Sequence, residues 1–138
     1  MELIEVGDFF AEELIFDYQE MIAFLDIVKD INPIHRLKEN ELRDLSRSDT
    51  LTVQGMYGVC MFSGLLSRNF PNSINVSRNV LFVRPMYLSD RFSISLKIKE
   101  IRRDDNIGVL KGYIKNSKGK ICVDCTTEIR NEKLFGKK

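Results

Sequence analysis

The sequence predicts an α+β domain in which one apolar helix packs against a curled antiparallel sheet. Residues 52–73 are TVQGMYGVCMFSGLLSRNFPNS, a stretch almost without a polar face, which is typical of a helix buried on nearly all sides. Four later runs are rich in Val, Ile and Phe, are separated by turn-forming residues, and occupy positions 75–85, 91–103, 106–116 and 120–130. A sheet must curl around such a helix to cover it.

The N-terminal part of the chain shows a strand pattern and then a helical one. FFAEELIF predicts a first strand, and apolar residues then follow at helical spacing behind Asp17, a residue typical of a helix N-cap. Pro33 disfavours helical geometry at Asn32. We therefore expect the helix to end near Asp30 and NPIH to form an ordered turn.

The remaining segments complete a single predicted domain. LKENELRDLSRS suggests a short polar helix, and the four C-terminal runs suggest an antiparallel meander, in which each strand pairs with the next. No repeat, low-complexity tract or linker divides the chain, so one domain spanning residues 1–138 is expected. The basic tail, about 132–138, is expected to fray.

Charge and hydropathy exclude several classes of protein. The 21 basic and 20 acidic residues leave a formal charge of +1, which gives no electrostatic case for binding nucleic acid or an anionic membrane. No apolar stretch approaches the roughly 20 residues that cross a bilayer. The acidic N-terminus, MELIEVGDFF, lacks the layout of a signal peptide. These observations predict a cytoplasmic protein.

The cysteines predict neither a disulfide framework nor a metal site. There are three, an odd number, and the cytoplasm would keep them reduced. Cys122 and Cys125 match C-x-x-C, but they lie in a strand-like run, where side chains three positions apart face opposite sides. With Cys60 they are interpreted as structural thiols.

The stretch DINPIH places a carboxylate and the only histidine of the chain within six residues. Near neutral pH a carboxylate accepts a proton and a neutral imidazole accepts or donates one, which suits general acid–base chemistry by Asp30 and His35. In the alternative interpretation Asp30 ends a helix, Asn32 begins an Asx-type turn and His35 is an ordinary surface residue. The residues of the turn alone leave both interpretations open.

This turn resembles the Asp-x-Asn-Pro-x-His signature of the MaoC-like (R)-specific enoyl-CoA hydratases and dehydratases, which have the hot-dog fold. The four specified positions are matched by Asp30, Asn32, Pro33 and His35. Family members open the central helix with a segment ending His-Gly-Met and continue to a Ser-Gly-Leu-Leu-like stretch. At the expected distance this chain has Val53-Gln54-Gly55-Met56 and then Phe62-Ser63-Gly64-Leu65-Leu66. The resemblance extends over most of the chain.

The resemblance implies a lyase of fatty acid metabolism that reversibly hydrates 2-enoyl thioesters to 3-hydroxyacyl thioesters, without a metal or redox cofactor. Coenzyme A is the expected carrier, and acyl carrier protein is the alternative. Asp30 and His35 are implied to act on one water. The Gly55 N–H is implied to bind the thioester carbonyl, and Ser63 to orient Asp30 or border the acyl pocket. The alternatives are close packing at Gly55 and an ordinary helix serine at Ser63.

Two departures from the family pattern lie beside these residues. Gln54 stands where many members have His, and Arg36-Leu37 where Leu-Asp is common. They leave room for a non-catalytic acyl-binding module or partner subunit. A hot-dog thioesterase is the nearest rival among enzymes, although it gives no reason for the turn. Because one curled sheet has exposed edges, we expect a homodimer with the acyl thioester near the subunit boundary.

Overall fold

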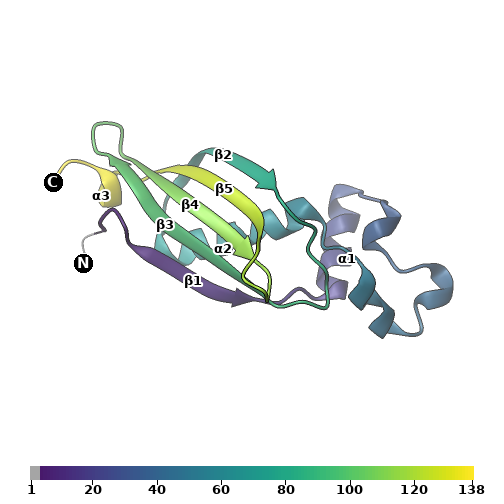
Figure 1. Cartoon of the computed structure of the whole chain (residues 1–138). Coiled ribbons are helices and arrows are strands. Elements are labelled where there is room, and N and C mark those ends of the chain that lie inside the picture. The colour runs from purple at the N-terminus through teal and green to yellow at the C-terminus, as the bar shows by residue number, and fades with distance from the viewer. Residues whose placement is uncertain (1–3) are drawn as a thin grey trace.

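A five-stranded antiparallel sheet forms the framework of the molecule. The computed structural model describes residues 4–138, and its strands lie in the order β1-β3-β4-β5-β2, with helix α2 across one face (Figure 1). The strands are β1 (Phe9–Leu14), β2 (Ile74–Phe82), β3 (Phe92–Arg102), β4 (Ile107–Lys115) and β5 (Ile121–Arg130). The helices are α1 (Tyr18–Val28), α2 (Gly55–Asn69) and α3 (Glu132–Phe135), with the short 3-10 helices η1 (Pro33–His35), η2 (Glu39–Glu41) and η3 (Leu45–Thr50). The predicted α+β class is confirmed.

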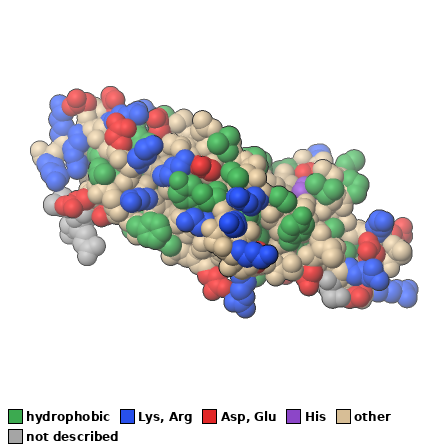
Figure 2. Space-filling model, viewed as in Figure 1, with side chains coloured by type: hydrophobic (Ala, Val, Ile, Leu, Met, Phe, Trp, Pro, Cys, Tyr) green, Lys and Arg blue, Asp and Glu red, His purple; other side chains and the backbone are tan. Residues whose placement is uncertain are grey.

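Alternation along β3 decides which face of the sheet is buried. Every second residue is apolar and at most 3% exposed: Phe92, Ile94, Leu96 and Ile98. Full burial of a side chain of this size contributes about 1.5–3 kcal/mol, so a slip of one residue, which would expose all four, is strongly disfavoured. The opposite face is turned toward the viewer in Figure 2, where Lys and Arg side chains gather among hydrophobic ones.

The position of β2 differs from the predicted meander. β3, β4 and β5 pair in sequence order as predicted, but β2 pairs with β5, and β1 occupies the place beside β3. The prediction of a four-stranded meander is therefore wrong for β2. A strand pattern identifies the residues of a strand without identifying its neighbour, which long-range packing selects. As a result, β1 and β2 are the two edges of the sheet.

Helix α1 begins and ends where the sequence predicts. Asp17 is its N-cap, and the Asp17 carboxylate accepts a hydrogen bond from the N–H of Glu20 at 3.0 Å. At the other end Lys29 has a φ of 61°, the left-handed conformation that terminates many helices. The N–H of Asp30 then donates to the carbonyl of Leu25 at 2.9 Å. This cap turns the chain toward η1.

Helix α2 packs one side against the sheet and leaves a stripe of its other side exposed. Its buried residues include Val59, Phe62 and Leu65, each at most 2% exposed. Phe62 can approach the sheet closely because β4 has a glycine there: a Cβ on Gly112 would lie 2.7 Å from the Phe62 ring. The exposed stripe follows helical spacing and consists of Met56, Cys60, Ser63 and Ser67.

The segment between α1 and α2 contains short 3-10 turns where a polar helix was predicted. The carboxylate of Glu41 accepts from the N–H of Lys38 at 3.0 Å, which caps η2, and η3 follows. The sequence 37–48 is strongly charged and lacks a continuous apolar face that would pack a longer helix. Local capping therefore determines the backbone here.

The C-terminal tail packs against the core, whereas fraying was expected. Residues Glu132–Phe135 form α3, and Phe135 is 0% exposed. Its ring stacks on Phe70 at a centroid distance of 6.1 Å and lies directly over Gly108, where a Cβ would be 2.5 Å from the ring. The basic composition of the tail does not reveal that Phe135, with Leu134 beside it, packs against the core.

The three cysteines are free thiols. Cys122 and Cys125 are buried, which raises the pKa of both thiols, and Cys60 is exposed. Within residues 4–138 no group of three or more His, Cys, Asp or Glu side chains is arranged to hold a metal ion. None of the helices in the same range is long and apolar enough to span a membrane.

We predict that Phe135→Ala lowers the free energy of unfolding by about 3–5 kcal/mol, because it removes a fully buried ring and leaves a cavity. Denaturant unfolding at one fixed protein concentration measures the change. Phe9→Ala is the matched control, since Phe9 is 62% exposed and its loss should change stability by about 0.5 kcal/mol or less. Equal effects of the two substitutions would contradict the packing of α3.

Candidate active site

The turn after α1 is closed by its own side chains. The Asp30 carboxylate accepts a hydrogen bond at Oδ1 from the N–H of Asn32 at 2.9 Å. Asn32 in turn caps η1, because its Oδ1 accepts from the N–H of Ile34 at 3.3 Å and Pro33 supplies the first helical residue. The Asx-type geometry of the alternative interpretation is therefore present, and it holds the Asp30 carboxylate in a defined position.

His35 is buried and its tautomer is fixed by the chain that precedes α2. His35 is 7% exposed, and its Nδ1 lies 2.8 Å from the carbonyl oxygen of Thr52. A carbonyl only accepts hydrogen bonds, so Nδ1 carries the proton in the neutral ring. Among the side chains and backbone groups that the structure describes, none forms a hydrogen bond with Nε2, whose lone pair is therefore available to accept a proton. His35 is not the ordinary surface residue of the alternative interpretation.

The Asp30 carboxylate has a second partner from the start of α2. Gln54 Nε2 donates to Asp30 Oδ2 at 3.3 Å. The pKa of Asp30 is lowered from its ordinary value, first by the hydrogen bond from the Asn32 N–H; partial desolvation opposes this, while the Gln54 amide and the charges of His35 and Arg36 lower it further. The carboxylate is therefore ionised near neutral pH.

Gly55 begins α2 immediately after Gln54. A Cβ at this position would lie 2.7 Å from the Phe82 ring, so the close-packing role of the glycine is supported. The first N–H groups of a helix lack partners within the helix, and within residues 4–138 the Gly55 N–H donates to no acceptor. It lies at the positive end of the helix dipole.

Hydrogen bonds from Gln54 to Asp30 and between His35 and Thr52 join the turn after α1 to the segment that begins α2. Among the described residues, the site combines an ionised carboxylate, an imidazole whose Nε2 has no hydrogen-bond partner and a helix N–H without an acceptor. Such a set can hold a water molecule, transfer one of its protons and stabilise negative charge on an oxygen atom. It contains no cluster suited to a metal ion in the described part of the chain.

The chain is similar in sequence to a dehydratase and a hydratase. No protein-family model matches the chain. It is 27% identical over 109 residues to a mitochondrial 3-hydroxyacyl-(acyl-carrier-protein) dehydratase of Arabidopsis thaliana, a match that covers 79% of this chain and 64% of that protein. It is 26% identical over 122 residues to the (R)-specific enoyl-CoA hydratase of Aeromonas caviae, covering 87% and 90%. The chain therefore spans less than two thirds of the plant relative's length.

Solved structures give the same result for the fold. The (R)-hydratase from A. caviae involved in PHA biosynthesis aligns with a TM-score of 0.79 and 25% identity, over 92% of this chain and 96% of that one. A MaoC-like dehydratase from Rhodospirillum rubrum aligns with a TM-score of 0.70 and 17% identity, over 98% and 95%. The chain is similar to the MaoC-like hydratases and dehydratases of the hot-dog fold.

Relative to the MaoC-like pattern, both departures noted in the sequence contact Asp30. Gln54 binds its carboxylate, and the Arg36 guanidinium donates to its backbone carbonyl from Nε at 3.1 Å and from Nη2 at 2.8 Å. Arg36 also pairs with Asp26 at 2.9 Å. The contacts of Gln54 and Arg36 with Asp30, and that of Thr52 with His35, were not predicted from the sequence. The only sequence feature that pointed to these residues was their position next to the two motif blocks.

Ser63, expected near the site of a MaoC-like protein, lies on the exposed stripe of α2. The hydrogen bonds that the Asp30 carboxylate accepts come from Asn32 and Gln54, not from Ser63. The structure thus brings together Asp30, His35 and the start of α2 at Gly55, and leaves Ser63 about two helical turns away. The role of Ser63 stays a prediction.

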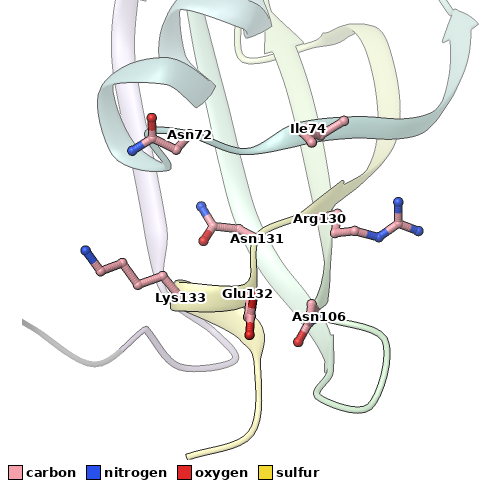
Figure 3. Close-up of a pocket in the computed structure, with 7 residues that line it drawn as sticks. All are labelled: Asn72, Ile74, Asn106, Arg130, Asn131, Glu132 and Lys133. Atoms are coloured by element: carbon pink, nitrogen blue, oxygen red, sulfur yellow. The ribbon is translucent and has the colours of Figure 1, made fainter.

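A separate hollow, whose lining residues are drawn in Figure 3, lies beside α3, which Figure 1 places at the end of the molecule opposite to α1. Its volume is about 560 Å³, and buried Asn131 contributes to its wall. The Asn131 amide donates to the Pro71 carbonyl and to Ser73 Oγ, each at 3.0 Å, and accepts from the Leu134 N–H at 3.1 Å. This amide joins α3 to the start of β2, which is a structural role remote from the MaoC-like turn.

The single histidine allows a direct test of the site geometry. At a pH of about 9, where an imidazole is neutral, ¹⁵N NMR should show His35 with a protonated Nδ1 and an unprotonated Nε2. Urea-unfolded protein is the control, and its single imidazole should give averaged signals from both tautomers. A folded-state spectrum with the proton on Nε2 would contradict the hydrogen bond to Thr52.

Proposed function

We propose that this protein catalyses the reversible addition of water to 2-enoyl thioesters, giving 3-hydroxyacyl thioesters. The observation that carries the proposal is that one turn holds both the Asp30 carboxylate and an imidazole whose Nε2 has no hydrogen-bond partner among the described residues. The relatives support the reaction class, since one is named an enoyl-CoA hydratase and another a 3-hydroxyacyl dehydratase. The enzyme is accordingly a lyase of fatty acid metabolism.

In the proposed reaction Asp30 and His35 hydrogen-bond the same water molecule. One of them removes a proton as the water oxygen forms a bond to C3 and the C2=C3 π electrons move toward the thioester oxygen. The proton is then returned to C2, so that water is consumed and no other reactant is needed. Dehydration follows the same path in reverse.

Negative charge develops on the thioester oxygen during this reaction and requires a donor. The Gly55 N–H is the proposed donor, supported by its unpaired position at the first residue of α2. Ser63 is proposed to border the acyl pocket, on the exposed stripe of the same helix. The reaction uses no metal or redox cofactor.

Coenzyme A is the proposed carrier of the acyl chain, and acyl carrier protein is the second candidate. The A. caviae relative is named for a CoA substrate and the plant relative for an acyl-carrier-protein substrate. Rates with the two thioesters of one acyl chain decide between them. The cytoplasm is the proposed compartment, in keeping with three unpaired cysteines, and microscopy of the tagged protein tests it.

Product analysis separates the proposal from its rivals. Loss of the enoyl absorbance without release of thiol indicates hydration, whereas free thiol indicates a thioesterase. Binding of a 2-enoyl-CoA without conversion indicates a non-catalytic acyl-binding module or partner subunit. The fixed His35 tautomer and the two donors on Asp30 favour the enzyme over the module, since binding alone requires neither.

We predict that Asp30→Asn and His35→Gln each lower the turnover of enoyl-CoA hydration by about 10²-fold or more, because each removes a proton acceptor. The double variant should lose much less than the product of the two single losses, since both groups serve one water. The assay is the decay of the enoyl absorbance, with the thermal unfolding midpoint as a check on folding. Near-wild-type turnover of both single variants would remove the catalytic assignment.

A homodimer is also proposed. β2 is an edge strand, and its exposed apolar side chains include Val76 at 42% and Leu81 at 62%. Met56 of α2 is 49% exposed on the stripe that the sheet leaves uncovered. Two copies of one edge strand pair antiparallel about a twofold axis, which buries such a surface on both.

The wild-type protein should therefore sediment as a dimer at micromolar concentration. Val76→Lys combined with Leu81→Lys should yield a monomer, because four lysines would meet at the interface. The control pair is Ile27→Lys with Val28→Lys, which changes two exposed apolar residues of α1 and should leave the dimer intact. A monomeric wild-type protein with full activity would refute the proposal.

A further inference from the structure

Each polar atom of Asp30 has a partner in the folded chain. The N–H donates to Leu25, the carbonyl accepts from Arg36, and the two carboxylate oxygens accept from Asn32 and Gln54. Three of these partners belong to α1 or the turn, so only Gln54 arrives from a different part of the fold. The orientation of the carboxylate relative to α2 therefore depends on this one side chain.

The geometry points to Gln54 as a positioning residue that aims the Asp30 carboxylate at the reacting water and couples it to the start of α2. This inference rests on the proposed function of Asp30. Gln54 itself contacts Asp30 and the backbone of α2, and it acts on the reaction through them.

The direction of the Gln54 amide is set by its second hydrogen bond. Gln54 Oε1 accepts from the backbone N–H of Tyr57 at 2.6 Å, which caps α2. An amide NH₂ group has no lone pair with which to replace this oxygen, so Nε2 must be the atom that faces Asp30. Oδ2 of Asp30 therefore faces a hydrogen-bond donor, the Gln54 Nε2 group.

The uncharged Gln54 amide affects the pKa of the Asp30 carboxyl. The charged or titratable groups acting on Asp30 within residues 4–138 are His35 and Arg36 from the turn, and Asp26 of α1 is paired with Arg36. Gln54 adds a hydrogen bond to the ionised carboxylate without exchanging a proton itself. Removing that donor should raise the pKa of Asp30 and free the carboxylate to rotate.

Gln54→Glu separates this role from helix capping. The variant keeps an oxygen acceptor for the Tyr57 N–H, and a negative charge at a helix N-terminus is favourable, so the cap of α2 should survive even though the new carboxylate repels Asp30. It replaces the donor toward Asp30 with a second carboxylate. Gln54→Met removes both hydrogen bonds at nearly constant size, and Gln19→Glu makes the same chemical change at an exposed position of α1.

The first readout needs no enzymatic activity. Carboxyl ¹³C NMR, with the Asp30 signal assigned from its loss in Asp30→Asn, should show Asp30 titrating at higher pH in Gln54→Glu and Gln54→Met than in the wild type and Gln19→Glu. In Gln54→Glu the two carboxyls titrate as a coupled pair. An unchanged Asp30 titration in both Gln54 variants overturns the inference, and if one variant does not fold the other decides by the same criterion.

The second readout is the pH profile of hydration. In Gln54→Glu the acidic limb should move to higher pH by about one unit or more and kcat near neutrality should fall at least about tenfold, with KM changed by less than about threefold. A purely capping role predicts wild-type kinetics for this variant and would overturn the inference. If the wild-type protein has no hydratase activity, the proposed reaction fails, while the NMR titration still decides whether Gln54 controls Asp30.

Discussion

Burial of one face of α2 against the sheet fixes the short segment that leads into it, and both groups of the candidate active site are held by that segment. Val53 is 4% exposed and its N–H donates to the Met86 carbonyl at 2.7 Å. The residues on either side of it, Thr52 and Gln54, bind His35 and Asp30 respectively. Because neighbouring side chains in an extended segment point to opposite sides, anchoring Val53 in the core directs the side chains of Thr52 and Gln54 toward the turn, where Thr52 Oγ1 lies 3.2 Å from His35 Nδ1.

The turn that carries Asp30 is held by more than its own sequence. Lys29 adopts a left-handed conformation, which costs a non-glycine residue on the order of 1 kcal/mol. The hydrogen bond from the Asp30 N–H to Leu25 and those from Arg36 to the Asp30 carbonyl offset that cost. Such over-determination is expected where a backbone position must be reproduced accurately for chemistry.

What the sequence predicted correctly were features set by local chemistry. The N-cap at Asp17, the end of α1 near Asp30 and the existence of strand β3 follow from neighbouring residues. The place of β2 beside β5 and the burial of Phe135 depend on partners far away in the chain, which periodicity does not encode. The same limit explains the site: Asp30 and His35 stand in one motif, whereas their contacts with Gln54 and Thr52 arise only when α2 docks.

The two candidate catalytic groups differ in a way that suits a division of labour in the proposed reaction. The donors around Asp30 lower its pKa, so the carboxylate keeps its charge near neutrality but binds a proton weakly. In the proposed reaction His35, with Nδ1 tied to Thr52 and no hydrogen bond at Nε2 among the described residues, can carry the proton between water and C2. In the proposed reaction Asp30 contributes charge and orientation as well as a proton acceptor, in keeping with surroundings that fix its position and not only its protonation state.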